Sequence, residues 1–434
     1  GFAPDGSLLA CYCVKGRWHL GKLDKGQQRM RRVEGVAPFT SFRSFSISGK
    51  WAAFKAASPL QPPSIVRLNL KSEKVHILHS SSEHSLEPDS ISVPQLITFP
   101  TGDTVKDSLY SSQSFHANSF SSSPGKNQDT EVGFAWYYPP TNKDFRAPEY
   151  ELPPMLVSMH GGPTSSAEAI FDIEVQYWTS RGFAYLDMNY RGSTGFGRAY
   201  WEKLNHQWGV ADVEDCVNAA RYCVVIGKAD SSRLAIHGRS AGGYTTLAAL
   251  TQAPMLFKAG ASFYGISDLE LLARDTHKFE AGYLEWLVGP YPKDTWVYRD
   301  RSPIHHVDRL RTPIIFFQGT DDPVVPPNQA EIMVSTLKRK GLPVAYVTFE
   351  GEGHGFVQAD NIQRALDLEL YFYAEVFNFL LPKPYRGVEI HNLQAFKASK
   401  AWQAPVQDDC MGPGADCGEC RTGQDCFVPQ TWCK

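Results

Sequence analysis

The stretch Ile236–Leu250, "IHGRSAGGYTTLAAL", constrains the fold more than any other part of this sequence. The apolar run "RLAI", which overlaps its start, predicts a buried strand, and the small and apolar residues after Ser240 have helical spacing. Gly238 and Gly242 stand two positions before and after Ser240, where larger side chains would collide with the strand and the helix. The pattern predicts a strand, a sharp turn that exposes the Ser240 hydroxyl, and a helix, which is the arrangement that presents a serine nucleophile.

A serine hydroxyl becomes reactive when a base accepts its proton and a third group orients that base. Downstream, the apolar strand "TPIIFFQG" leads into a polar turn with Asp321 and Asp322, either of which could face a histidine. A further strand through Phe349 leads into a glycine-rich loop that carries His354. Serine, acid and histidine therefore follow in the order that one class of hydrolases uses, each after a strand, which predicts a catalytic triad.

Such a triad also needs N–H donors for the oxyanion that forms on the attacked carbonyl group. The residue after the nucleophile, Ala241, is expected to supply the first backbone N–H. The loop "HGGP" follows the predicted strand Met155–Met159, and its glycines would let an amide approach the substrate closely. We assign the second donor to the backbone of Gly162.

The rest of the chain predicts an α/β fold with a strand-rich start. Strands near residues 155, 183, 234, 314 and 345 alternate with helices near 166, 213, 241, 328 and 362, which is typical of a doubly wound sheet. Before residue 88, two β-rich segments repeat after about 43 residues, and such a period favours blades of a partial β-propeller over two unrelated hairpins. We expect propeller blades in residues 1–88, a catalytic domain in 89–384 and a tail in 385–434.

Motifs from about residue 90 to 384 resemble the prolyl oligopeptidase family of serine peptidases, most closely its acylaminoacyl-peptidase and dipeptidyl-aminopeptidase-like branch. The segments that carry the resemblance are "HGGPTS", "YWTSRGFAYLDMNYRGSTGFGRAYW", "WGVADVEDC", "GRSAGGYTTLAAL", "GISDLE", "RSPI", "FFQGTDD", "VVPPNQAE" and "FEGEGHGF". The resemblance implies an α/β-hydrolase domain after a truncated propeller, Ser240 as nucleophile and His354 as base. It also implies Asp322, with Asp321 as the alternative, since the family's acid usually stands three residues after the glycine that ends the strand. No cofactor or metal is implied.

Substrate contacts are less apparent in the sequence than the chemistry. Many members of the family place Arg or Asn where this chain has Val324, so the anchoring of the second substrate residue stays open. Glu280, in the aromatic-rich segment 275–292, could bind a peptide amino group or could be a surface carboxylate. The partner expected from the resemblance is a short peptide, and the sequence does not indicate an oligomeric state.

The net charge, the apolar stretches and the cysteine content limit the possible partners and the cellular location. The net charge of the 434 residues is −3, and "KGQQRMRR" is an isolated basic run, so nucleic-acid binding is not expected. No apolar stretch reaches membrane-spanning length. The first 384 residues predict a cytoplasmic protein, whereas five cysteines after residue 409 favour a secreted one. This tail could be disordered or foreign, a disulfide module, or half a zinc site at Cys417 and Cys420.

The sequence therefore predicts a serine peptidase that cleaves aminoacyl or acyl-aminoacyl bonds of short peptides. A carboxylesterase would use the same triad and is the alternative enzyme. A catalytically silent interaction protein is the alternative outside enzymes, because some members of the resembled family have lost activity.

Overall fold

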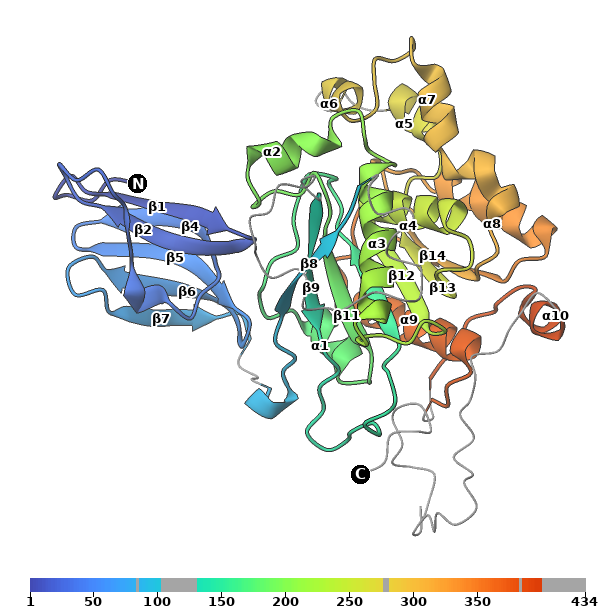
Figure 1. The fold of residues 1–434 in the computed structure, drawn as a ribbon, viewed down its shortest axis with the longest axis horizontal. Helices are drawn as coiled ribbons and strands as arrows, with labels where there is room; N and C mark the ends of the chain where they lie inside the picture. The colour runs from blue at the N-terminus through green and yellow to red at the C-terminus, as the bar shows by residue number, and fades with distance from the viewer. Residues whose placement is uncertain (83–85, 103–130, 276–280, 382–384, 400–434) are drawn as a thin grey trace, which may run out of the picture.

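The computed structural model describes residues 1–82, 86–102, 131–275, 281–381 and 385–399, and an eight-stranded sheet forms the centre of the larger part (Figure 1). The strands lie in the order β15-β14-β13-β12-β10-β11-β9-β8. Those from β15 to β11 are parallel, and β9 and β8 extend the sheet antiparallel. The bounds are β8 Gln95–Pro100, β9 Val132–Tyr138, β10 Met155–Met159, β11 Ala184–Asn189, β12 Leu234–Arg239, β13 Ala259–Phe263, β14 Ile314–Gly319 and β15 Val344–Phe349.

Helices cover both faces of this sheet, so the central strands are buried along nearly their whole length and are mostly apolar. One apolar core packs α3, α4 and α8 on one face, and a second packs α1 and α9 on the other. The α-helices in the described residues are α1 Ile173–Thr179, α2 Arg198–Trp201, α3 Ala211–Val225, α4 Ala241–Gln252, α5 Leu269–Asp275, α6 Ala281–Leu287, α7 Thr295–Arg301, α8 Asn328–Lys340, α9 Ala359–Phe377 and α10 Leu393–Ala398. The short 3-10 helices are η1 Glu34–Val36, η2 Pro88–Ser90, η5 Glu202–Leu204 and η6 Pro303–Arg309.

The α/β-hydrolase fold predicted from the sequence is confirmed, with one local difference. A helix expected near residue 166 is absent there, because residues 160–172 run as an irregular segment and α1 begins only at Ile173. The chain passes from β10 to β11 on one side and then to β12 on the other side of β10. In open α/β sheets, such a reversal leaves a crevice at the carboxyl ends of the strands, where ligands bind.

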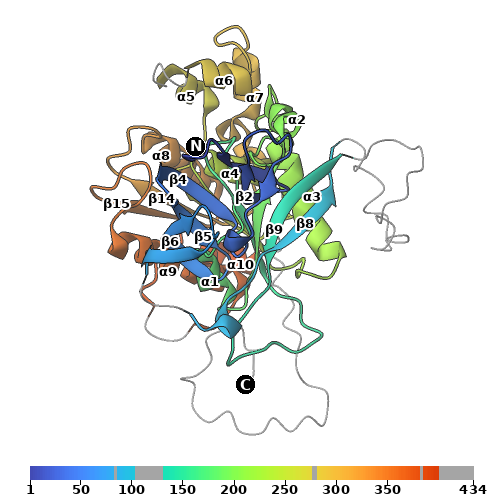
Figure 2. The ribbon, with the colours of Figure 1, turned by 90° about the vertical axis from the view of Figure 1, so that its left-hand side faces the viewer.

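Residues 1–80 form two smaller antiparallel sheets, which lie beside the hydrolase part (Figures 1 and 2). One sheet has the order β1-β2-β3 and the other the order β4-β5-β6-β7. Four consecutive strands paired in sequence are the form of one propeller blade, so this strand-rich region is consistent with the expected partial propeller. The bounds are β1 Leu8–Val14, β2 Arg17–Leu23, β3 Arg31–Arg32, β4 Ser41–Ser48, β5 Trp51–Ser58, β6 Gln61–Asn69 and β7 Val75–Ser80.

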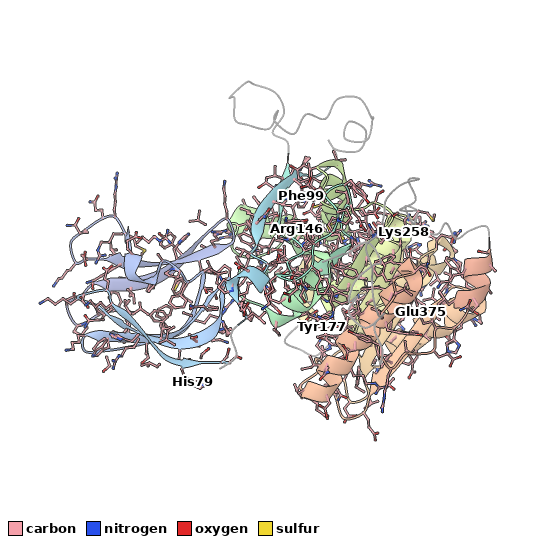
Figure 3. All side chains as sticks on the ribbon, turned by 90° about the horizontal axis from the view of Figure 1, so that it is seen from below. His79, Phe99, Arg146, Tyr177, Lys258 and Glu375 are labelled. Atoms are coloured by element: carbon pink, nitrogen blue, oxygen red, sulfur yellow. The ribbon has the colours of Figure 1, made fainter. Side chains whose placement is uncertain are left out.

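These sheets have an apolar core of their own, around Leu20, Phe54 and Val66. Figure 3 shows their side chains, with His79 labelled, as a group distinct from the hydrolase part that carries Phe99, Tyr177 and Glu375. The domain boundaries at residues 88 and 384 stay predictions. The cysteines of the tail, including Cys417 and Cys420, lie outside the described residues. Within the described ranges, no helix is both long enough and apolar enough to cross a membrane.

Candidate active site

Ser240 occupies the sharp turn between β12 and α4, as the sequence predicts. Its backbone has φ 55° and ψ −121°, a strained conformation for a residue with a side chain. The turn requires glycine at positions 238 and 242, because the surrounding backbone leaves no room there for a side chain. A Cβ added at Gly238 would lie 2.2 Å from the Gly242 carbonyl oxygen, and one at Gly242 would lie 2.0 Å from the Met159 carbonyl oxygen. The strain therefore holds the Ser240 side chain at the carboxyl end of the sheet.

The structure brings Ser240, His354 and Asp322 together. His354 Nε2 lies 2.8 Å from Ser240 Oγ, and His354 Nδ1 lies 2.9 Å from Asp322 Oδ2. The Asp322 side chain is fully buried, whereas 20% of the His354 side chain is exposed. A proton can therefore pass from the serine to an imidazole that remains within reach of solvent.

Two backbone amides fix the orientation of the Asp322 carboxylate. Oδ1 accepts hydrogen bonds from the N–H groups of Val324 and Val325, both at 2.9 Å, so Oδ2 is turned toward His354. Val324 thus supports the acid through its backbone N–H group. Its side chain, whose role as a substrate contact the sequence left open, is 38% exposed. The Asp321 carboxylate instead accepts from the Thr320 hydroxyl on the exposed side of the turn. Asp322 is the aspartate that faces the histidine.

The loop with Gly161 and Gly162 lies against the nucleophile turn. A Cβ on Gly161 would lie 2.9 Å from the Arg239 carbonyl oxygen and 3.4 Å from Ser240 Cβ, and Gly162 has φ 54°. Ala241 is the first residue of α4, where backbone N–H groups have no partner within the helix. This placement suits the two predicted oxyanion donors, whose roles stay predictions.

His160, at the start of the same loop, is held on both edges and on one face of its ring. Its Nε2 lies 2.7 Å from the Ser193 hydroxyl and its Nδ1 lies 3.0 Å from the Gly161 carbonyl oxygen, while its ring stacks on Tyr190 at 4.3 Å between centroids. Burial lowers the pKa of His160 to about 4, so its imidazole is neutral at pH 7. A neutral ring fixed on both edges keeps the glycines after it in place.

Comparison with known proteins agrees with this geometry. Residues 169–379, which include Ser240, Asp322 and His354, match the family model described as prolyl oligopeptidase family. This chain contains a prolyl oligopeptidase family domain. The resemblance inferred from the sequence motifs is thereby confirmed.

Relatives of the prolyl oligopeptidase domain carry peptidase names. The chain is 33% identical over 214 residues to dipeptidyl aminopeptidase BIII of Pseudoxanthomonas mexicana, covering 48% of this chain and 31% of that enzyme. It is 34% identical over 212 residues to the acylamino-acid-releasing enzyme of Arabidopsis thaliana, covering 46% of this chain and 27% of that enzyme. These matches agree with the predicted branch of the family.

A solved structure extends the likeness to the strand-rich region. The structure of a puromycin-hydrolysing peptidase of Mycobacterium tuberculosis matches with a TM-score of 0.80 and 38% identity, over 90% of this chain and 55% of that chain. The chain therefore spans about half the length of that protein, and its matches cover 31% and 27% of the two enzymes above.

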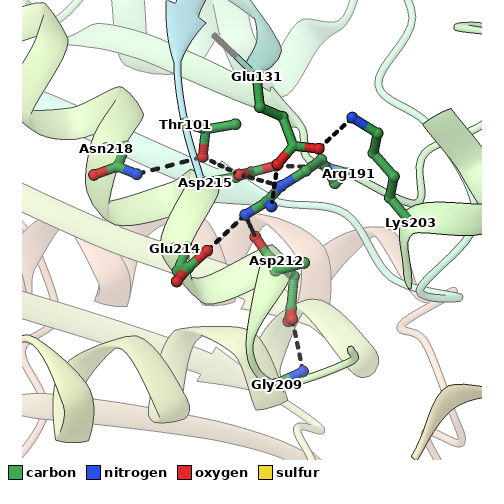
Figure 4. A network of polar contacts seen from close by, with 10 residues as sticks. Thr101, Glu131, Arg191, Lys203, Gly209, Asp212, Glu214, Asp215 and Asn218 are labelled. Atoms are coloured by element: carbon green, nitrogen blue, oxygen red, sulfur yellow. Dashed lines mark hydrogen bonds and ion pairs between the residues drawn. The ribbon is translucent and has the colours of Figure 1, made fainter. Parts of the chain in front are cut away.

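A buried ion network fixes the part of the prolyl oligopeptidase domain that carries Ser193 (Figure 4). Arg191 donates from Nε to Asp215 at 2.9 Å, from Nη1 to Glu131 at 2.9 Å and from Nη2 to Glu214 at 2.8 Å. All three side-chain nitrogens of this arginine are thus paired with carboxylates, and its side chain is only 9% exposed. The network ties the loop after β11 to α3.

Asp212 extends this region toward the nucleophile helix. Its carboxylate accepts from the Gly209 N–H at 2.6 Å and from the Thr245 hydroxyl at 2.5 Å, and Thr245 lies one turn after Ala241 in α4. The Asp212 side chain is completely buried. Sequence reasoning missed Asp212, Arg191 and His160 as supports, because their partners lie on other elements.

Two further points concern Glu280 and metal ligands. Glu280, the candidate contact for a peptide amino group, lies outside the described residues. Across the described part of the chain, no three His, Cys, Asp or Glu side chains gather in a way that could hold a metal ion.

Proposed function

We propose that this chain is a serine peptidase that hydrolyses aminoacyl or acyl-aminoacyl bonds of short peptides through an acyl-enzyme. The observation that carries the proposal is the continuous hydrogen-bonded chain from Asp322 through His354 to Ser240. The family match and the peptidase names of the relatives support it.

Each residue has a defined task in this mechanism. The Ser240 oxygen attacks the substrate carbonyl while His354 Nε2 takes the hydroxyl proton across 2.8 Å. Asp322 keeps the other imidazole nitrogen protonated and stabilises the charge that the ring gains. The N–H groups of Ala241 and Gly162 bind the oxyanion. When the tetrahedral intermediate collapses, His354 gives its proton to the leaving amine, and water then releases the acyl group by the same steps.

The experiment measures hydrolysis of aminoacyl and acyl-aminoacyl β-naphthylamides by the wild-type chain and by Ser240→Ala and His354→Ala. Both variants should lose about 10⁴-fold or more of kcat, since triad members act as a unit. His79→Ala, which changes an exposed histidine on β7, is the matched control and should keep full activity. A fluorophosphonate probe should label the wild type at Ser240. Turnover retained in Ser240→Ala, or a folded wild type without label, would reject the proposal.

Matched esters and amides of the same acyl group distinguish the two enzyme classes. A peptidase should cleave the amide with a measurable kcat/KM, whereas turnover of the ester alone would identify a carboxylesterase that uses the same triad.

A further inference from the structure

Arg239, the residue before the nucleophile, has a different environment from the buried Arg191. Both oxygens of Glu174 accept from its Nη2 atom, at 2.7 and 2.8 Å. A guanidinium has five N–H groups, and Arg239 also forms a hydrogen bond with the Tyr264 side chain, so donors still remain for another acceptor. The side chain is 37% exposed although it carries an ion pair. Arg239 therefore presents a fixed positive charge with free donors next to Ser240.

Aromatic rings place this charge on the histidine side of the site. The Arg239 guanidinium lies 4.8 Å from the ring centroid of Phe263. Burial raises the pKa of the adjacent Tyr264, and the charge of Arg239 partly offsets that rise, which marks the two groups as neighbours. The Tyr264 ring in turn lies 4.9 Å from the His354 ring, between centroids. One aromatic side chain thus links the guanidinium to the catalytic imidazole.

The chemistry of acyl transfer determines which part of a substrate lies beside His354, Tyr264 and Arg239. The imidazole donates its proton to the leaving amine, so the leaving segment must lie on the imidazole side of the scissile bond. A chain that continues past His354 and Tyr264 reaches Arg239. The acceptors it can offer are a backbone carbonyl or, when one or two residues leave, the terminal carboxylate.

Building on the peptidase activity proposed above, we propose that Arg239 binds an oxygen of the leaving segment and so favours peptide over non-peptide leaving groups. Glu174 positions the guanidinium for this contact. Burial acts to raise the pKa of Glu174, but the charge of Arg239 outweighs it and the pKa falls below its ordinary value, so the pair stays ionised at neutral pH. Planar guanidinium groups match carboxylate and carbonyl oxygens well.

The test compares three leaving groups on one acyl part: an amino acid with a free carboxylate, the same amino acid as its carboxamide, and β-naphthylamine, which has no oxygen. In Arg239→Gln, kcat/KM for the free acid should fall roughly 10- to 100-fold, as expected for one charged hydrogen bond. The value for the naphthylamide should change less than about twofold, since that leaving group makes no such contact. A larger loss for the acid than for the carboxamide identifies the carboxylate as the partner, and equal losses identify the carbonyl.

Controls separate this role from a structural one. Glu174→Gln keeps the guanidinium but removes the ionic partner that positions it, so it should cause a smaller loss with the same selectivity for the peptide leaving groups. Arg31→Gln removes an ion pair to Glu73 within the strand-rich region and should leave all three values unchanged. Equal losses on all three substrates in Arg239→Gln, no loss on any, or a larger selective loss in Glu174→Gln than in Arg239→Gln would overturn the proposal. Naphthylamide turnover by the wild type tests the peptidase activity independently.

Discussion

Asp322→Asn tests how the site sets the protonation of its histidine. The two N–H groups of Val324 and Val325 require an acceptor at the Oδ1 position, so the oxygen of an introduced asparagine amide should remain there. Its NH₂ group then faces His354 Nδ1. Turning the amide over would leave two buried N–H groups facing an NH₂, at a cost of about 2 kcal/mol or more, so the unflipped form should dominate by roughly 30-fold.

In this unflipped form, His354 Nδ1 must accept a hydrogen bond, and the proton moves to Nε2. The protonated Nε2 cannot accept the proton of Ser240, which lies 2.8 Å away. We therefore expect Asp322→Asn to lower kcat by about 10⁴-fold, the effect of a wrong tautomer in serine peptidases, with little change in KM.

The assay is steady-state hydrolysis of an aminoacyl β-naphthylamide at pH 7.5, together with the rate of fluorophosphonate labelling. Asp321→Asn is the matched control, because its carboxylate binds the Thr320 hydroxyl and not the histidine. That variant should keep kcat within about twofold. A loss below tenfold in Asp322→Asn, or a comparable loss in Asp321→Asn, would refute this account of the triad.

Two further substitutions test the supports of the site. Burial raises the pKa of Asp212 from 3.8 to about 6, so its contribution to stability is present below pH 4 and is lost as the pH rises through 6. The free energy of unfolding of Asp212→Asn, relative to wild type, should therefore rise by about 2.5 kcal/mol between pH 4 and 7.5 in urea titrations, and a pH-independent difference would contradict this. In Gly242→Ala, the added Cβ would lie 2.0 Å from the Met159 carbonyl oxygen, which should destabilise the fold by about 1–3 kcal/mol and abolish fluorophosphonate labelling. Gly282→Ala, where an added Cβ meets nothing within 4 Å, is the control, and equal behaviour of the two variants would disprove the steric explanation.

Much of this arrangement could be predicted from the sequence because it depends on local rules. A glycine-flanked serine between an apolar run and a helical pattern has few other conformations, so the turn at Ser240 was predictable to the residue. The parallel strands end at one edge of the sheet, so the loops that carry Asp322 and His354 had to meet near it. The choice between Asp321 and Asp322 was made by family resemblance alone, since two adjacent aspartates look alike in a turn.

Other features depend on contacts between distant residues and could not be predicted. Arg239 pairs with Glu174, 65 residues away, and His160 binds Ser193, 33 residues away. The helix expected near residue 166 followed from the general alternation of strands and helices. The residues there instead contact the N-terminal sheets, whose position the sequence pattern does not give.

Those contacts connect the strand-rich region with the geometry of the site. The Phe171 N–H donates to the Ser58 carbonyl at 2.6 Å, and the Thr40 hydroxyl donates to the Ala169 carbonyl at 2.5 Å. Both bonds hold the segment that begins with Gly161 and Gly162 and ends at α1, where Glu174 pairs with Arg239. Since a displacement of about 1 Å in an oriented site can cost two orders of magnitude in rate, we expect these sheets to support catalysis through the loop they hold.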